Sequence, residues 1–179
     1  MTYFIKPRAA ITIFLFSAFM CTANAFTFNS KTDPEVVSTV DITRYVGSWY
    51  EIAHSPNFFQ RGCEYSTAEY QIINAESISV HNVCHHSDNT ISDIEGTATI
   101  VDPAVPAKLK VRFNFFARGD YWITELDQNY QWAVVSGPGK KSLFILSRVA
   151  PMDKELLQQI LTTLENKGFD TTDLIYDKY

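Results

Sequence analysis

The stretch Gly47-Ser48-Trp49-Tyr50-Glu51-Ile52-Ala53 decides the fold of this 179-residue chain. Its Gly-x-Trp sequence opens a run of residues that predicts a β-strand. A second motif, Ile145-Leu146-Ser147-Arg148, ends another predicted strand about a hundred residues later. Either motif alone is weak, because a Gly-x-Trp tripeptide also arises by chance. Their order and spacing, with a helical pattern directly after Arg148, make them informative together.

Short runs rich in β-branched and aromatic residues alternate with turn signals along most of the chain. In the clearest run, Lys108–Phe115, every second residue is apolar, so one face points inward and the other meets water. The eight runs cover residues 47–55, 64–74, 77–86, 91–102, 108–116, 120–127, 130–136 and 142–148. Their short, turn-rich connections favour antiparallel hairpins. The predicted fold is all-β: an eight-stranded antiparallel up-and-down β-barrel with room inside for one small ligand.

After Arg148 the apolar period changes from 2 to 3.6 and predicts one amphipathic C-terminal α-helix. Asp153 is a suitable N-cap and Gly168 a suitable stop signal. The apolar stripe consists of Leu156, Leu157, Ile160, Leu161 and Leu164. A membrane-surface helix is the alternative, but the polar face carries little positive charge. We therefore expect this helix to pack on the outside of the barrel.

The first 25 residues have the pattern of a removable secretory signal peptide. Lys6 and Arg8 precede an apolar stretch at residues 10–20, and Ala23-Asn24-Ala25 is a suitable peptidase site. An uncleaved membrane anchor is disfavoured, because the apolar stretch is shorter than the roughly 20 residues of a spanning helix. We therefore expect cleavage after residue 25, which leaves a chain long enough for one domain.

Acylation of Cys21 is a third possibility for this leader. It is disfavoured because Ala18-Phe19-Met20 lacks the Leu and small residues that lipoprotein processing favours. The expected organisation is a signal peptide at residues 1–25, an extended N-terminal arm at 26–40 and one domain at 41–179. The expected location is the periplasm in soluble form, or outside the cell, rather than the outer membrane through an acylated Cys21.

The charge of the exported chain restricts its partners. Removing Lys6 and Arg8 with the signal peptide changes the formal charge from −5 to −7. An acidic chain is unsuited to nucleic acid, or to anionic lipid headgroups, as bulk electrostatic partners. Any membrane contact would then be apolar, local and transient. Phe58 and Phe59, in the first long loop, are candidates for such a contact.

Three blocks of the sequence resemble the lipocalins, above all the bacterial lipocalins and their apolipoprotein D-like relatives. The blocks are Gly47–Ala53, Asp127–Pro138 and Leu143–Arg148, and the likeness extends over residues 41 to about 177. The resemblance implies lipid carriage by an eight-stranded barrel. It also gives Gly47, Trp49 and Arg148 structural roles, with the Trp on the barrel floor and the Arg across it. A guanidinium there can stack on the ring and donate to nearby backbone carbonyls.

Inward-pointing side chains would line the barrel interior, where the resemblance places a ligand. On the first strand, parity with Trp49 selects Glu51 and Ala53. The full candidate set is Glu51, Ala53, Leu109, Val111, Phe113, Phe115, Tyr130, Trp132 and Val134. The chain has 13 Phe, 9 Tyr and 3 Trp, which suits a long apolar ligand such as a fatty acid or a lysophospholipid. The alternative is that these side chains fill a solid core.

Loss of Cys21 with the signal peptide leaves Cys63 and Cys84, which we expect to form a disulfide in an exported chain. The alternative is a free nucleophile, as in the lipocalins that isomerise prostaglandins. The sequence lacks Gly-x-Ser-x-Gly, His-Glu-x-x-His and phosphate-loop motifs. We therefore expect a binding protein with no enzymatic activity and no cofactor.

A haem or metal site would be a further alternative, built on His81, His85 and His86. Adjacent histidines on a strand point to opposite faces, and no carboxylate cluster accompanies them in the sequence, so we expect no metal site. The expected function is binding, storage or transport of a fatty acid or lysophospholipid in the cell envelope. A monomer or weak dimer is the expected state.

Overall fold

The structure is a computed structural model that describes Met1 and residues 33–113 and 117–179. The rest of the predicted signal peptide after Met1, the first part of the predicted N-terminal arm and Phe115 lie outside these residues. Nine strands, two α-helices and one 3₁₀-helix occupy the described part of the chain.

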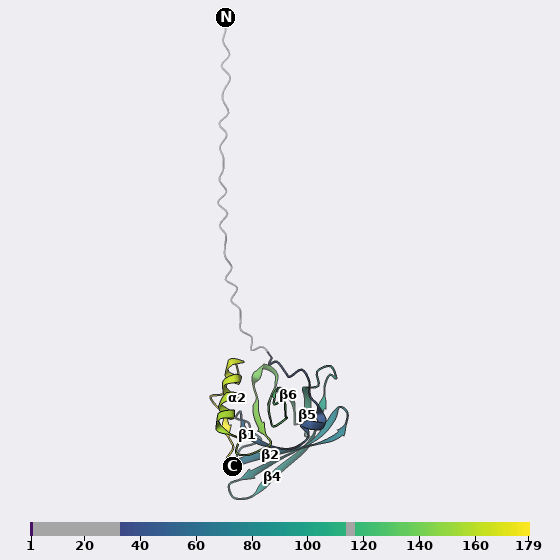
Figure 1. The fold of residues 1–179 in the computed structure, drawn as a ribbon, viewed down its shortest axis with the longest axis vertical. Coiled ribbons are helices and arrows are strands. Elements are labelled where there is room, and N and C mark those ends of the chain that lie inside the picture. The colour runs from purple at the N-terminus through teal and green to yellow at the C-terminus, as the bar shows by residue number, and fades with distance from the viewer. Residues whose placement is uncertain (2–32, 114–116) are drawn as a thin grey trace.

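Antiparallel strands form one continuous sheet that closes on itself (Figure 1). The strands are β1 (Gly47–His54), β2 (Cys63–Asn74), β3 (Ser77–His86), β4 (Ile91–Ile100), β5 (Lys108–Arg112), β6 (Arg118–Leu126), β7 (Trp132–Ser136), β8 (Leu143–Ser147) and β9 (Ile175–Tyr176). Each strand from β2 to β8 pairs with the next along the chain, and β1 pairs with both β8 and β2. These pairings confirm the eight-stranded up-and-down barrel.

Strand bounds differ little from those predicted, with two exceptions. β5 ends at Arg112, which is earlier than the predicted run 108–116. The two-residue β9, which pairs with the end of β1, has no counterpart among the predicted strands. A pair of residues in a C-terminal tail is too short to show a period in the sequence.

The C-terminal helix α2 (Lys154–Asn166) packs against the outside of the barrel, as predicted (Figure 1). The Asp153 side chain caps it by accepting a hydrogen bond from Leu156 N at 2.9 Å. Gly168 has a φ of 76° just beyond its end, a conformation that glycine adopts without strain. The outer cluster, which joins helix and barrel wall, consists of Ile52, Ala53, Val134, Leu143, Ile145, Met152, Ile160, Leu164 and Phe169. Among the described residues, no helix is long and apolar enough to cross a membrane.

A second apolar cluster fills the inside of the barrel at one end. This inner cluster consists of Tyr45, Trp49, Tyr70, Ile78, Val80, Ala98, Ala107, Leu109, Val111, Ile123, Tyr130, Ala133, Val135 and Leu146. The short helix α1 (Ile42–Tyr45) lies directly before β1 and contributes Tyr45 to this cluster. The predicted disulfide is confirmed: Cys63 at the start of β2 is bonded to Cys84 near the end of β3.

Candidate functional site

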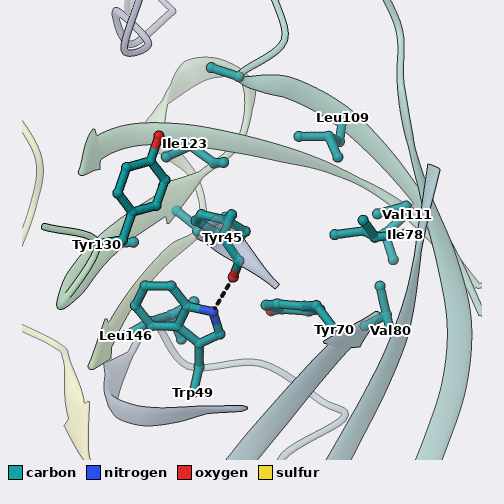
Figure 2. Close-up of a cluster of buried hydrophobic side chains, with 14 residues drawn as sticks. Tyr45, Trp49, Tyr70, Ile78, Val80, Leu109, Val111, Ile123, Tyr130 and Leu146 are labelled. Atoms are coloured by element: carbon teal, nitrogen blue, oxygen red, sulfur yellow. Dashed lines mark hydrogen bonds between the residues drawn. The ribbon is translucent and has the colours of Figure 1, made fainter. Parts of the chain in front are cut away.

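The floor of the barrel is built around Trp49, which is fully buried. Its indole Nε1 donates a hydrogen bond to the Tyr45 carbonyl at 2.8 Å, so the polar edge of the ring is satisfied (Figure 2). The Arg148 guanidinium lies over the ring face, with Cζ 3.7 Å from the ring centroid. The two sequence motifs therefore meet in one cation–π contact, which closes this end of the barrel.

Arg148 also ties the chain segment that enters β1 to the floor. Its guanidinium donates to the carbonyls of Ser48 at 2.8 Å, Val46 at 2.9 Å, and Arg44 and Tyr45 at 3.0 Å each. Gly47 lies beneath this group with a φ of +95°, and a Cβ at this position would lie 3.4 Å from Arg148 Nη1. The left-handed backbone and the close guanidinium explain the glycine of the Gly-x-Trp sequence.

Three tyrosine hydroxyls, those of Tyr45, Tyr70 and Tyr121, meet inside the closed end among apolar side chains. Figure 2 shows Tyr45 and Tyr70 there. The Tyr45 and Tyr121 hydroxyls are hydrogen-bonded at 2.6 Å, and the Tyr121 hydroxyl donates to that of Tyr70 at 3.1 Å. Burial raises the pKa of Tyr70 to about 12, so this cluster stays neutral at physiological pH. The hydroxyls satisfy one another, as buried polar groups must, and the closed half of the barrel is well filled.

The open half of the barrel is different, because its inward-facing side chains are only partly buried. Ala68 on β2, Phe113 after β5 and Phe144 on β8 all pack against the inner cluster while remaining half-buried. Asn82 shares the inward parity of Val80 on β3, and its Oδ1 is buried without a hydrogen-bond partner among the described residues. Half-buried apolar side chains beside one unpaired buried acceptor suit a ligand that is mainly apolar and carries a donor.

The predicted lining residues divide between the two faces of the barrel wall. Leu109, Val111 and Tyr130 belong to the inner cluster, Phe113 packs against it, and Glu51 lies opposite Leu146 of that cluster. Ala53, Trp132 and Val134 instead pack with the outer cluster beneath α2. This corrects the orientation expected for those three side chains.

Two local irregularities cause the difference. In β1, Glu51 pairs with Leu146 and Ala53 pairs with Ile145, so Ile52 is an extra residue in a β-bulge that reverses the parity. Before β7, Tyr130 has a φ of 60° and belongs to a turn rather than to the strand. Parity from Tyr130 therefore does not continue into β7, where Ala133 and Val135 face inward.

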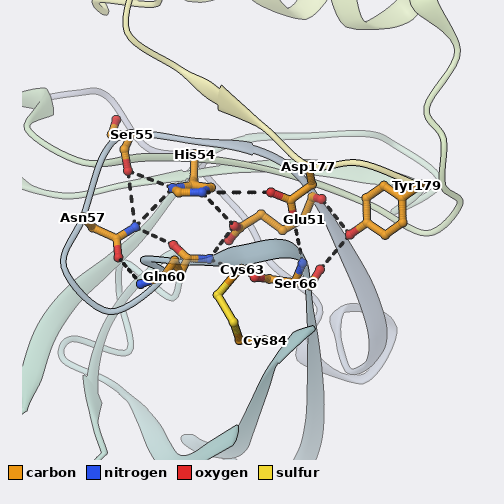
Figure 3. A network of polar contacts seen from close by, with 10 residues as sticks. All are labelled: Glu51, His54, Ser55, Asn57, Gln60, Cys63, Ser66, Cys84, Asp177 and Tyr179. Carbon is orange, nitrogen blue, oxygen red and sulfur yellow. Dashed lines mark hydrogen bonds and ion pairs between the residues drawn. A yellow bond between two sulfur atoms is a disulfide. The ribbon is translucent and has the colours of Figure 1, made fainter. Parts of the chain in front are cut away.

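A buried polar cluster lies at the end of β1 that leads into the first long loop (Figure 3). The His54 Nε2 atom is 3.8 Å from Glu51 Oε1 and 4.0 Å from Asp177 Oδ1. Gln60 Nε2 donates to Glu51 Oε1, and Ser66 N donates to Asp177 Oδ2. Sequence reasoning missed His54 and Asp177, since nothing in their local pattern relates residue 177 to β1.

Burial changes the ionisation of this polar cluster. Desolvation, with a smaller contribution from the Asp177 charge, raises the pKa of Glu51 to about 8. Desolvation also raises the pKa of Asp177 to about 6 and lowers the pKa of His54 below its usual value. All three shifts disfavour the charged forms, as expected for groups held away from water.

The C-terminal residues fill a seam where β1 and β2 diverge. Asp177 N donates to Ile52 O of β1 at 3.1 Å, whereas Lys178 N donates to Glu64 O of β2 at 2.9 Å. The Tyr179 hydroxyl reaches both strands, with Glu51 O at 2.8 Å and Ser66 O at 2.7 Å (Figure 3). The tail thus satisfies backbone groups that the barrel itself leaves unpaired.

Tyr179→Phe is expected to lower the free energy of unfolding by about 1 kcal/mol. The substitution removes the hydroxyl group whose single proton the Glu51 and Ser66 carbonyls share. Urea unfolding followed by Trp fluorescence measures the change. Tyr176→Phe is the matched control, since the half-exposed Tyr176 hydroxyl makes no hydrogen bond with any described residue. Equal losses in the two variants would contradict a bridging role for Tyr179.

The three histidines considered from the sequence do not converge. His81 is paired with Asp93 at 2.9 Å, and His85 stacks on Tyr65 with 4.2 Å between ring centroids. His86 bonds the Gly62 carbonyl through Nδ1. In the part of the chain that the structure describes, the group that could hold a metal ion is Glu51, His54 and Asp177.

The first long loop exposes two aromatic side chains beside this polar cluster. Phe58 is 71% and Phe59 77% exposed, and the two rings contact each other edge-to-face. The Arg61 guanidinium lies 5.0 Å from the Phe58 ring centroid. The loop therefore presents an apolar tip with an adjacent positive charge.

Comparison with known proteins agrees with this architecture. The model of the lipocalin-like domain matches residues 40–178. The chain belongs to the lipocalin family. It is 37% identical to the outer membrane lipoprotein Blc of Vibrio cholerae, over 78% of this chain and 83% of that protein. It is 36% identical to apolipoprotein D of Macaca fascicularis over 59% of this chain and 56% of that protein.

Among solved structures, the lipocalin barrel resembles insecticyanin from the tobacco hornworm Manduca sexta. The TM-score is 0.64 with 19% sequence identity, over 83% of this chain and 84% of that one. This likeness concerns the fold. Lipocalins as a family bind small hydrophobic ligands, so the barrel interior is the candidate functional site of this chain.

Proposed function

We propose that this lipocalin binds a single-chain acyl lipid, a fatty acid or a lysophospholipid, in the open half of its barrel. The observation that carries the proposal is the contrast between the two halves of the interior. The closed half is filled around Trp49, whereas Phe113, Phe144 and Ala68 in the open half pack on the inner cluster without being fully buried. Apolar surface that is left accessible inside a barrel favours an apolar ligand.

The polar groups of the open half suit the headgroup end of such a ligand. Asn82 Oδ1 would accept a hydrogen bond from the free hydroxyl of a lysophospholipid or from the protonated carboxyl group of a fatty acid. The acyl chain would lie against Phe113, Phe144 and Leu109, with its end toward the tyrosine cluster. Val111 and Tyr130 support this interior from the inner cluster.

Export and a carrier or storage role in the cell envelope complete the proposal. The relatives named outer membrane lipoprotein and apolipoprotein support an exported protein. The sequence pattern of residues 1–25 favours a soluble periplasmic or secreted form. Brief contact of Phe58 and Phe59 with a membrane would let the barrel receive its lipid. Because Cys63 and Cys84 are both held in the disulfide, binding is favoured over thiol-based isomerase chemistry.

Mass spectrometry of lipids released from the purified protein, followed by Trp-fluorescence titration, tests the proposal. If burial of the acyl chain drives binding, each added methylene contributes roughly 0.8 kcal/mol, or about fourfold in affinity, until the space is full. Affinity that ignores chain length and follows the headgroup alone would contradict this mechanism.

Ala68→Phe is expected to weaken acyl-lipid binding by at least about tenfold, because the larger ring occupies interior space beside Asn82. The measurement is the same fluorescence titration, with thermal unfolding recorded alongside. Gln71→Phe is the matched control, since it places the same ring on the exposed face of the same strand. Equal affinities of the two variants would show that the ligand lies elsewhere.

A further inference from the structure

Three potential ligand atoms converge at the end of β1, from parts of the chain that are far apart in sequence. They are Glu51 Oε1, His54 Nε2 and Asp177 Oδ1, and donor atoms of these residues lie within 4.8 Å of one another (Figure 3). The β-bulge after Glu51 brings Glu51 and His54 to the same side of β1. The pairing of β9 with Ala53 and His54 brings Asp177 beside them.

The tautomer of His54 makes this arrangement unusual. Its Nδ1 lies 2.9 Å from the Ser55 carbonyl, an acceptor, and 3.2 Å from Asn57 Nδ2, a donor that also has acceptors in Gln60 Oε1 and the Ser55 carbonyl. The shorter Ser55 contact therefore assigns the proton of the neutral ring to Nδ1. In the neutral ring Nε2 then has a lone pair, and this lone pair points toward two carboxylates. Nε2 makes no hydrogen bond with any described residue, although the His54 side chain is only 4% exposed. A buried acceptor that faces other acceptors requires a cation or a proton between them.

The chain supplies no fixed positive charge to this group. Among the ion pairs of the described residues, His54 is the only basic partner of Glu51 or Asp177. The Glu51 and Asp177 side chains are only 10% and 4% exposed. Two carboxylates held so close together away from water are costly unless a cation or bound protons compensate them.

We propose that Glu51, His54 and Asp177 form a binding site for one divalent transition-metal ion, with Zn²⁺ as the best match. Two carboxylates and one imidazole are a three-ligand set that leaves a coordination position open. In a tetrahedral Zn²⁺ site with ligands at roughly 2.1 Å, neighbouring ligand atoms lie about 3.4 Å apart. The His54 Nε2 atom is 3.8 Å from Glu51 Oε1 and 4.0 Å from Asp177 Oδ1, so small side-chain rotations are enough to bind the ion. Mg²⁺ and Ca²⁺ prefer six or more oxygen ligands and are disfavoured by the imidazole.

The surroundings orient each ligand as metal sites require. The Ser55 carbonyl accepts from His54 Nδ1, which directs Nε2 toward the carboxylates. Gln60 donates to Glu51, and the Ser66 backbone donates to Asp177. Outer partners of this kind fix the ligand tautomer and rotamer before the ion arrives. The site lies at the end of β1 near the Phe58 loop and borders the interior proposed for lipid, because the His54 ring stacks on Phe144 with 6.5 Å between ring centroids.

Titration of the disulfide-intact mature protein with Co²⁺ and Zn²⁺, after removal of metal by a chelator, tests the proposal. We expect saturable visible d–d absorption with Co²⁺, its displacement by Zn²⁺, and a higher melting temperature with Zn²⁺. Glu51→Gln and Asp177→Asn are each expected to weaken Zn²⁺ binding by at least about 100-fold, because loss of outer partners alone costs 10- to 100-fold.

Asp93→Asn is the control, because it breaks the exposed His81–Asp93 pair and leaves the proposed site intact. Zn²⁺ affinity that is unchanged in Asp93→Asn and lost in the other two variants supports the site. No saturable binding to the wild-type chain, or binding that survives both Glu51→Gln and Asp177→Asn, overturns it. The Co²⁺ absorption of the wild-type protein reports low-coordinate binding of the ion even if a variant fails to fold. Lipid titration of the metal-free wild-type protein keeps failure of the metal site distinct from failure of lipid binding.

Discussion

Arg148→Ala is expected to lower the free energy of unfolding by about 3–5 kcal/mol. The substitution removes hydrogen bonds to the carbonyls of four floor residues, Arg44, Tyr45, Val46 and Ser48. Each lost bond costs about 1 kcal/mol, with the larger losses at the part-buried carbonyls of Tyr45 and Val46. Loss of the cation–π contact with Trp49 adds about 1 kcal/mol. Urea unfolding at neutral pH measures the sum.

Arg44→Ala is the matched control for this effect. Arg44 also lies over an aromatic ring, 4.2 Å from the Tyr130 centroid, but its side chain is exposed and donates to one carbonyl, that of Gln128. We expect a loss below about 1 kcal/mol for that variant. Arg148→Lys should recover only part of the stability, because an ammonium cannot reach the same set of carbonyls from above the ring. Comparable losses in the two alanine variants would show that Arg148 has no special role in the floor.

Removal of the disulfide, in a Cys63→Ser/Cys84→Ser double variant, is expected to cost about 3 kcal/mol of unfolding free energy. The bridge joins residues separated by 21 positions. Closing a loop of this length restricts the unfolded chain, and the lost conformational entropy corresponds to about 3 kcal/mol of stabilisation. The double variant is used because a single substitution leaves a free thiol. Thermal and urea unfolding of both proteins measure the change.

The lipid affinity of the double variant shows whether the disulfide only stabilises the fold or also shapes the ligand space. Cys63 and Cys84 join β2 and β3, which are already paired along most of their length. We therefore expect acyl-lipid affinity to change by less than about threefold under conditions where the variant is folded. A large loss of affinity with unchanged stability would instead show that the disulfide shapes the ligand space.

The sequence by itself determined the barrel, the outer helix and the disulfide. The strands and the helix could be predicted from local periodicity, as in Lys108–Phe115 and in the apolar stripe of α2. The pairing of consecutive strands could be predicted from the short turns that connect them. The cysteine pair followed from the count that remains after export. Trp49 and Arg148 were recognisable because they belong to motifs, although they are distant in sequence.

The tertiary structure alone decided which side chains face inward after each irregularity. The bulge at Ile52 arises where β1 pairs with β8 and β9 at once, and alternation within β1 cannot reveal it. It placed Ala53 in the outer cluster and His54 beside Glu51. The seam between β1 and β2, which the C-terminal tail fills, likewise depends on pairings between distant segments.

The convergence of Glu51, His54 and Asp177 has the same origin. Glu51 and His54 are close in sequence, but Asp177 joins them only because β9 pairs with the end of β1. The apolar period of a strand predicts which of its side chains face the core, but it does not predict which distant segment pairs with that strand. The contact with Asp177 depends on such a pairing, that of β9 with β1. Fold class could therefore be predicted from local pattern, and the chemistry of the polar cluster required the assembled barrel.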